Sequence, residues 1–436
     1  MKRAITLVVS LLLLVGLITN SPKAKAADYS GTCGVNLKWE LDISTGILTI
    51  SGNGNMDDFH SGKNPWYVYR ESIKTVKLPD GLTSIGKDAF EACYNLEDVI
   101  IPNNVKSIGA YSFYHCKSLT SIEIPVGVDS IGSGAFEKCW GFSSVVIPET
   151  VKEIGSSAFA HCGKLTNISL PEGMTSVPHE CFTGCTSLTS ICIPSDVTSI
   201  GSSAFKECDS LSAITIPENV TTIGSYAFAE CHELNAIEVP EKVIRIEEYC
   251  FMNCANLSEI KLPDNINSIG DYAFAGCESL TSIVLPTNLL SIDRGAFSGC
   301  SSLKQITISN GVNMIGKDVF RKCDALSDVY YEGSEDQKSY INISDGNSVF
   351  ESASFHYLDQ ESGSAGSDSN SDEMSNTSSD KTSFLRNLEN TSLDREGRFL
   401  EKQHSRVGVL IVSITLLGLA VLCLFLSIRI RERAEK

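Results

Sequence analysis

Apolar residues recur along this chain at a fixed interval of 23 residues. A phenylalanine marks the interval from Phe90 to Phe320, a cysteine follows it three residues later from Cys93 to Cys323, and a proline keeps the same phase from Pro79 to Pro286 before Ser309 replaces it. Eleven such units follow one another without an insertion. This regularity predicts a solenoid in which each unit forms one turn and stacks on the next.

The unit from Ile101 to Glu123 shows which elements one turn contains. Residues 119–124 alternate apolar and polar, as a half-buried strand does, and Pro125 ends that strand because it has no amide hydrogen. Val105 and Ile108 begin a second short extended segment. Gly109 is then expected to adopt a turn conformation that a side chain would resist. The strands of successive units should stack in parallel.

Two further sequence features predict the local structure of individual units. Pro178, Glu247 and Asp293 replace the turn glycine in three units, so those turns are expected to differ locally. In residues 202–208, hydroxyl side chains precede good helix formers. This pattern predicts one or two helical turns that direct Phe205 and Cys208 inward.

The repeat resembles the BspA-type leucine-rich-repeat family, whose units read I-P-x-x-V-x-x-I-G-x-x-A-F-x-x-C-x-x-L-x-x-I. The resemblance covers residues 73–331. It implies a curved solenoid, often displayed on microbial surfaces and linked to adhesion. The expected fold class is therefore an α/β repeat solenoid: a leucine-rich-repeat right-handed superhelix with short parallel strands, eleven full 23-residue repeats and caps.

The solenoid, residues 73–331, needs a cover at each end. In residues 27–72, Leu37, Trp39 and Leu41 alternate with polar residues, Thr45 and Gly46 turn the chain, and a second alternating run follows. This predicts a β-hairpin cap with Trp39 over the first repeat. Residues 332–358 contain short apolar pieces that could close the other end of the core.

The two ends of the chain predict a single-pass surface protein. Residues 1–26 have the charged start, apolar run and small-residue end of a secretory signal peptide. Residues 359–406 form a Ser- and Asp-rich stalk and juxtamembrane segment, and residues 407–428 form an uncharged transmembrane helix. Arginines in residues 429–436 place that tail in the cytoplasm and the solenoid outside the plasma membrane. The repeat type and signal peptide favour a bacterium, and a Gram-positive envelope is expected because it has no outer membrane to hide a protein held in the plasma membrane.

Charge and histidine placement argue against several functions. A formal charge of −18 disfavours nucleic acid and anionic lipid as ligands. We call the cysteines that recur every 23 residues, from Cys93 to Cys323, the ladder cysteines, and the phenylalanines of the same repeat the ladder phenylalanines. Three histidines lie next to ladder cysteines in separate units and are too far apart to share a metal: His115, His161 and His232. No stretch remains for a separate catalytic domain, so we expect no enzyme activity, no cofactor and no metal site. Six Asn-x-Ser/Thr sequons could carry glycans in a host that glycosylates them.

The sixteen cysteines allow two interpretations. A secreted protein normally pairs them as disulfides, but stacked side chains that point the same way suit the disulfide dihedral poorly. Cys181 and Cys250 also occupy a position that is Ala in most units. We therefore expect buried thiols that pack as small apolar residues.

Outward-facing strand positions are expected to form the ligand surface, on the concave side as in leucine-rich repeats generally. Hydroxyl-bearing, small and charged residues predominate there, which favours an extended protein or glycan over a small molecule. The hypothesis is adhesion; a structural surface coat is the alternative, and a hydrolase acting on surface polymers is a third. The candidate ligand residues are Glu123, Asn167, Ser169, Glu238, Glu259, Lys261, Gln305, Thr307, Asp328 and Tyr330.

Overall fold

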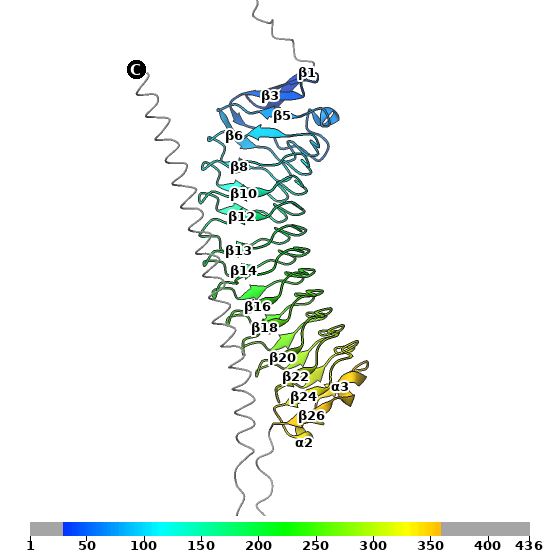
Figure 1. Ribbon diagram of the computed structural model, residues 1–436. Coiled ribbons are helices and arrows are strands. Elements are labelled where there is room, and N and C mark those ends of the chain that lie inside the picture. The colour runs from blue at the N-terminus through cyan, green and yellow to red at the C-terminus, as the bar shows by residue number, and fades with distance from the viewer. Residues whose placement is uncertain (1–28, 359–436) are drawn as a thin grey trace, which may run out of the picture. The chain divides into compact units, whose positions relative to one another are not determined.

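The computed structural model describes residues 29–358, which form successive turns stacked along one axis (Figure 1). The predicted signal peptide, stalk, transmembrane helix and tail lie outside the described residues. Within residues 29–358, every helix is too short or too polar to cross a bilayer. The parallel strands expected from the repeat are present, so the solenoid prediction is confirmed.

One side of the stack, here called the first strand row, holds the strand that ends at the repeat proline. These strands pair in parallel with a shift of one repeat, as Ile237 with Ile260. The three-residue strands bury their central residue between two outward ones, except that Ile260 is only partly buried. The row contains β5 (Thr75–Lys77), β7 (Asp98–Ile100), β10 (Ser144–Val146), β12 (Asn167–Ser169), β16 (Ala236–Glu238), β18 (Glu259–Lys261), β20 (Ser282–Val284), β22 (Gln305–Ile308), β24 (Asp328–Tyr331) and β26 (Ser354–Tyr357).

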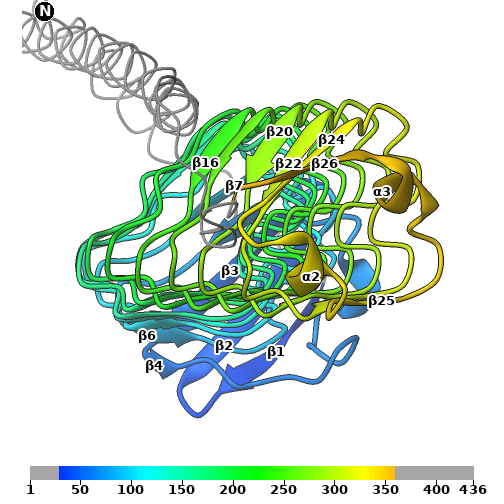
Figure 2. The same ribbon diagram turned by 90° about the horizontal axis from the view of Figure 1, so that it is seen from below.

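The second strand row lies on another side of each turn, as the end-on view shows (Figure 2). Its strands are mostly two residues long and bury the isoleucine or valine before the glycine position. The row contains β4 (Gly54–Asn55), β6 (Leu82–Ile85), β8 (Ser107–Ile108), β9 (Ser130–Ile131), β11 (Glu153–Ile154), β13 (Ser176–Val177), β14 (Ser199–Ile200), β15 (Thr222–Ile223), β17 (Arg245–Ile246), β19 (Ser268–Ile269), β21 (Ser291–Ile292), β23 (Met314–Ile315) and β25 (Asn342–Ile343).

Two of the three units that lack the turn glycine interrupt the second strand row. The pairing stops between β11 and β13, where Pro178 has no amide hydrogen to donate to the preceding turn, and again between β15 and β17, beside Glu247. Asp293 keeps the usual bond, from its amide to the Ile269 carbonyl at 2.8 Å. The expected local difference is therefore found at Pro178 and Glu247 but not at Asp293.

The reason for the glycine itself differs from the expectation. Gly109 does not need a left-handed backbone conformation. Instead, a Cβ at Gly109 would lie 2.6 Å from the carbonyl carbon of Gly86 in the turn below. Glycine therefore permits close approach of stacked backbones at this corner.

The third side of each turn, here called the turn row, is where the helix prediction is wrong. Residues 202–208 form consecutive tight turns rather than helix. Ser203 and Glu207 have φ values of 57° and 59°, which a right-handed helix cannot contain. The left-handed conformation of these two residues directs every second amide toward the next turn. The amides of Ser203, Phe205 and Glu207 thus donate to carbonyls of the next turn at 2.8 to 2.9 Å.

Phe205 and Cys208 nevertheless point inward, as predicted, and are fully buried. The eleven ladder phenylalanines form one column of nearly parallel rings, with neighbouring centroids 5.2 to 6.1 Å apart. Such offset stacking adds to the stabilisation that burial of each ring provides. The column is therefore the central axis of the core.

An N-terminal antiparallel sheet covers one end of the column. β1 (Tyr29–Gly34) pairs with β2 (Leu37–Asp42), which pairs with β3 (Ile47–Gly52), and β3 then pairs in parallel with β5. Trp66, just before the short 3-10 helix η1 (Tyr67–Tyr69), stacks on Phe90 at 5.7 Å. Trp39 packs edge-on against Trp66 at 5.8 Å. The ring directly over the first repeat is thus Trp66, and Trp39 lies one layer further out.

The C-terminal end continues the same column after an insertion. The segment with α2 (Glu335–Lys338) lengthens one turn, and α3 (Ser348–Ser352) then brings Phe350 to 4.8 Å from Phe320, with the rings nearly parallel. The spacing of 30 residues hides this repeat from a search at 23.

Replacing Phe205 by Ala should destabilise the protein by about 3 to 5 kcal/mol, because the cavity would open between two stacked rings in the middle of the column. Thermal unfolding followed by circular dichroism measures the change. Replacing the exposed Thr215 by Ala is the control and should change stability by less than about 0.5 kcal/mol. Equal stability of both variants would contradict the central role of the column.

Replacing Ser203 by Val should cost about 1 to 2 kcal/mol, since a left-handed backbone brings a Cβ close to the following carbonyl and a β-branched side chain worsens that contact. The matched control is Ser202→Val, one residue earlier and outside the left-handed set. Denaturant unfolding of both variants gives the comparison. A control that is as damaging as Ser203→Val would show that side-chain crowding, not backbone conformation, limits this position.

Candidate functional site

The outward side chains of the first strand row form two lines along the stack. In β12, Ile168 is buried while Asn167 and Ser169 face outward. Where neighbouring strands pair residue by residue, equivalent positions line up from turn to turn. This pairing is interrupted after β7, β12 and β18. Glu123 is exposed, but residues 121–125 form no strand, so the strand expected in that unit is absent. Eight of the ten candidate ligand residues lie exposed or partly exposed on the strands of this row: Asn167, Ser169, Glu238, Glu259, Lys261, Gln305, Asp328 and Tyr330.

Thr307 is the one buried candidate, because it is only 7% exposed. It faces outward in β22, but it pairs between Val284 and Tyr330, and these two larger side chains cover it. The prediction that Thr307 meets solvent is therefore wrong. The alternation of residues along a strand determines which face of the sheet a side chain points to. The size of the neighbouring side chains on the adjacent strands then determines how exposed it is.

Specific contacts order parts of this surface. The Lys261 ammonium lies 2.6 Å from a Glu238 carboxylate oxygen on the neighbouring strand, with both side chains exposed. Asp328 accepts from Ser327 Oγ at 2.6 Å and contacts His356 Nε2 at 2.8 Å. The Ser327 and His356 contacts lower the pKa of Asp328. Tyr330 stacks on the His356 ring at 4.8 Å, so the C-terminal part of the surface is held in place.

A shallow groove that the sequence analysis missed runs along the second strand row. Its volume is about 880 Å³, and it extends from Asn55 in the cap to Ser176. Gly109, Gly132 and Gly155 line it. A Cβ at any of them would meet the backbone of the preceding turn, so glycine keeps the stacked corners close together along the groove. The run of these glycines before Pro178 is the sequence feature that coincides with the groove.

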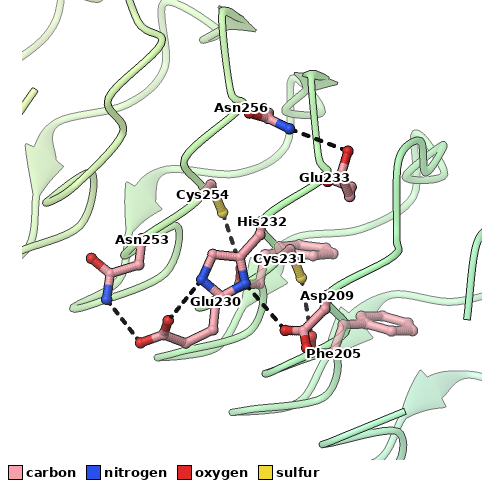
Figure 3. A network of polar contacts seen from close by, with 10 residues as sticks. Phe205, Asp209, Glu230, Cys231, His232, Glu233, Asn253, Cys254 and Asn256 are labelled. Atoms are coloured by element: carbon pink, nitrogen blue, oxygen red, sulfur yellow. Dashed lines mark hydrogen bonds and ion pairs between the residues drawn. The ribbon is translucent and has the colours of Figure 1, made fainter. Parts of the chain in front are cut away.

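The turn edge, defined as the residues two and four places after each ladder phenylalanine, carries a polar network around His232 (Figure 3). His232 lies between two carboxylates, with Asp209 at 3.1 Å and Glu230 at 3.3 Å. Asn253 donates to Glu230 at 2.8 Å. Just beyond the turn edge, Asn256 donates to Glu233 at 3.2 Å. Within residues 29–358, no three His, Cys, Asp or Glu side chains are arranged to hold a metal ion.

The ladder cysteines are free thiols, and fourteen of the fifteen cysteines in the described part of the chain are buried. Ten of them also donate a hydrogen bond, as Cys208 Sγ does to the Phe182 carbonyl of the preceding turn at 3.2 Å. Cysteine is therefore more than a small apolar residue here, because alanine would fill the space without this donor. Burial raises the pKa of Cys93, Cys185 and Cys254 to about 12.

Short parallel strands stacked at a constant repeat define a leucine-rich-repeat type of solenoid. The family model for the BspA type leucine rich repeat region matches residues 64–173, 106–235 and 221–356. This chain therefore belongs to the BspA-type leucine-rich-repeat family. No curated protein sequence matches it.

Solved structures that are similar to this chain include three bacterial proteins. A leucine-rich repeat protein of Eubacterium ventriosum is 25% identical, with 77% of this chain and 98% of that chain covered and a TM-score of 0.51. A leucine rich cell surface protein of Faecalibacterium prausnitzii is 30% identical, with 73% and 99% covered and a TM-score of 0.48. A leucine-rich repeat protein of Bacteroides ovatus is 25% identical, with 76% and 99% covered and a TM-score of 0.47.

The buried thiols should resist a thiol reagent at pH 8, because only the thiolate reacts and a pKa raised from 9.0 to about 12 removes most of it. Cys192, which is exposed, should react at once. Stability should fall as pH rises from 9 towards 12, because the unfolded thiols ionise there while the folded ones remain protonated.

Mass spectrometry of the labelled protein, before and after denaturation, locates each modified thiol. Cys192→Ser is the control and should abolish the fast reaction among residues 29–358. Rapid native labelling of Cys208 and its ladder neighbours, or disulfides that persist after denaturation, would contradict the arrangement of the ladder.

Proposed function

We propose that this protein is a single-pass surface protein whose solenoid binds an extended protein or glycan, in adhesion to host or neighbouring cells. The observation that carries the proposal is the pair of outward lines on the first strand row. They present one side chain per line per turn, mostly hydroxyl-bearing or charged, over the length of the stack. A long, shallow surface of this kind suits an extended partner better than a small molecule.

Family membership supports a binding role, since leucine-rich-repeat proteins generally serve as scaffolds for protein interactions. The surface location rests on the sequence alone: the apolar start within residues 1–26, the uncharged residues 407–428 and the arginines after them. The solenoid would then stand outside the plasma membrane, with the short C-terminal tail inside. We propose binding rather than catalysis as its activity.

Binding of the full-length protein, kept in mild detergent because of its apolar C-terminal segment, to intact cells and to immobilised matrix proteins and glycans tests this proposal. The test variant carries Glu238→Ala, Glu259→Ala and Lys261→Ala on the first strand row. It should lose about tenfold or more in affinity for any partner found, because contacts at the centre of an interface dominate its energy. Its thermal stability should stay nearly unchanged, because exposed ion pairs contribute little.

The matched control carries Glu241→Ala, Lys242→Ala and Asp264→Ala, which are exposed, lie in the same turns and have the same net charge, but follow the repeat proline and leave the row. It should bind as the unmodified protein does. Loss of binding in the control alone would move the surface away from the first strand row. A protein that coats cells yet binds no partner would instead favour the structural-coat function.

A further inference from the structure

The turn edge changes chemical character along the stack. Around Phe228 it is acidic, as the carboxylates beside His232 show (Figure 3). In the first three repeats five of the six equivalent positions are aromatic or basic instead: Tyr94, His115, Lys117, Lys138 and Trp140. We call these five residues, together with the adjoining Tyr114, the aromatic-basic patch. In a chain with a formal charge of −18, such a local reversal of charge needs its own explanation.

The rings of the patch form one packed cluster around His115. The His115 ring lies 5.0 Å from Tyr94 and 4.9 Å from Trp140, both edge to face, and 5.8 Å from Tyr114. Packing on several sides holds these rings in place before any ligand arrives. Trp140 remains 45% exposed, whereas Trp39 and Trp66 are buried in the N-terminal cap. A rigid, exposed indole is thus available on this edge.

Cations lie against the same rings. The Lys117 ammonium is 5.1 Å from the centroid of Tyr94, and the Lys138 ammonium is 4.8 Å from that of Tyr114 and 2.7 Å from its hydroxyl. Glu137 pairs with Lys138 at 3.1 Å. Burial, and then Lys138 and Lys117, lower the pKa of His115, against the opposite effect of Glu137. Two ammonium groups therefore lie beside the rings of the patch, which suits an anion.

The backbone of this edge is already used within the stack. The amide of His115 donates to Glu137 O at 2.7 Å, and that of Lys138 donates to Ala160 O at 2.8 Å. An extended peptide could not pair with these amides as an added strand. The patch therefore offers a partner aromatic ring faces and positive point charges. Tyr94 and Trp140 lie two turns apart, which is roughly 10 Å.

We propose that the aromatic-basic patch binds an acidic polysaccharide, with sugar rings against Trp140 and Tyr94 and carboxylate or sulfate groups beside Lys117 and Lys138. Sugar rings present apolar C–H faces that pack on aromatic side chains, and their anionic substituents match the lysines. This site extends the proposed binding function and uses no residue of the first strand row. If the binding experiment fails for one of the two surfaces, the proposal for the other surface is therefore unaffected.

Titration of the full-length protein in mild detergent against five polymers tests the proposal. Heparin carries sulfate and carboxylate, polygalacturonate carries carboxylate alone, dextran is neutral, dextran sulfate carries sulfate alone, and polyglutamate is an acidic peptide. We expect binding to at least one acidic polysaccharide, weakened by salt, and much weaker binding to dextran and polyglutamate. If heparin and dextran sulfate bind but polygalacturonate does not, the patch recognises sulfate groups. If polygalacturonate binds, it recognises carboxylate groups.

Variants separate the ring contribution from the charge contribution. Lys117→Gln with Lys138→Gln, and separately Trp140→Ala, should each raise the dissociation constant about tenfold, while Trp140→Tyr should restore most of the affinity. Lys322→Gln is the matched charge control, because Lys322 occupies the position of Lys138 in the last full repeat. Tyr340→Ala is the aromatic control, since Tyr340 is 81% exposed in the C-terminal cap. Both controls should bind normally.

The His115 ring gives a second readout that a loss of stability would not produce. Nuclear magnetic resonance should show its pKa rising when the acidic polysaccharide binds, because the bound anion offsets the two lysines. An unchanged His115 with full binding would overturn the proposal, as would equal binding of polyglutamate and the acidic polysaccharides. Affinity that survives both Trp140→Ala and the double lysine variant would overturn it too.

Discussion

Every turn of this protein depends on its neighbours to satisfy its backbone hydrogen-bonding groups. A buried amide or carbonyl without a partner costs a few kcal/mol, and these short strands and tight turns cannot supply enough partners from within one repeat. The amides of Ser203, Phe205 and Glu207 find theirs in the following turn. An insertion would disturb three rows of bonds at once unless it left the turn and returned in register, as the segment with α2 does. This constraint explains why eleven units keep the same length.

The same constraint selects residues whose role is not apparent from their chemistry alone. Each repeat places two residues in the left-handed region, and in the chain these positions hold Gly, Ala or polar and aromatic residues, never Val, Ile or Thr. The unfavourable conformation is retained because it directs amides along the stack. The ladder cysteine has a related role, since its thiol adds a donor to a carbonyl of the preceding turn, as Cys208 does for Phe182.

Side chains that face outward do not take part in the backbone hydrogen bonds or in the core. These positions can therefore vary from turn to turn, and we expect function to depend on them. The first strand row presents polar lines, the second strand row carries a groove from Asn55 to Ser176, and the turn edge passes from the aromatic cluster at His115 to the carboxylates at His232. All three surfaces rest on one scaffold with constant spacing. An extended partner can meet several turns at once, so modest contacts repeated along the stack can sum to a useful affinity.

Periodicity in the sequence was sufficient to predict the parallel stack, the strand that ends at the proline, and the burial of Phe205 and Cys208, because each depends on a pattern repeated within one unit. Contacts between units decided the rest. Residues 202–208 have helical propensity, but carbonyls of the next turn compete for their amides and left-handed residues break the helix. Thr307 has the parity of a surface residue, but Tyr330 and Val284 cover it. Phe350 lies out of phase in the sequence, yet an inserted segment returns it to the ring column. The groove and the aromatic-basic patch likewise exist only because stacking brings residues 23 positions apart into contact.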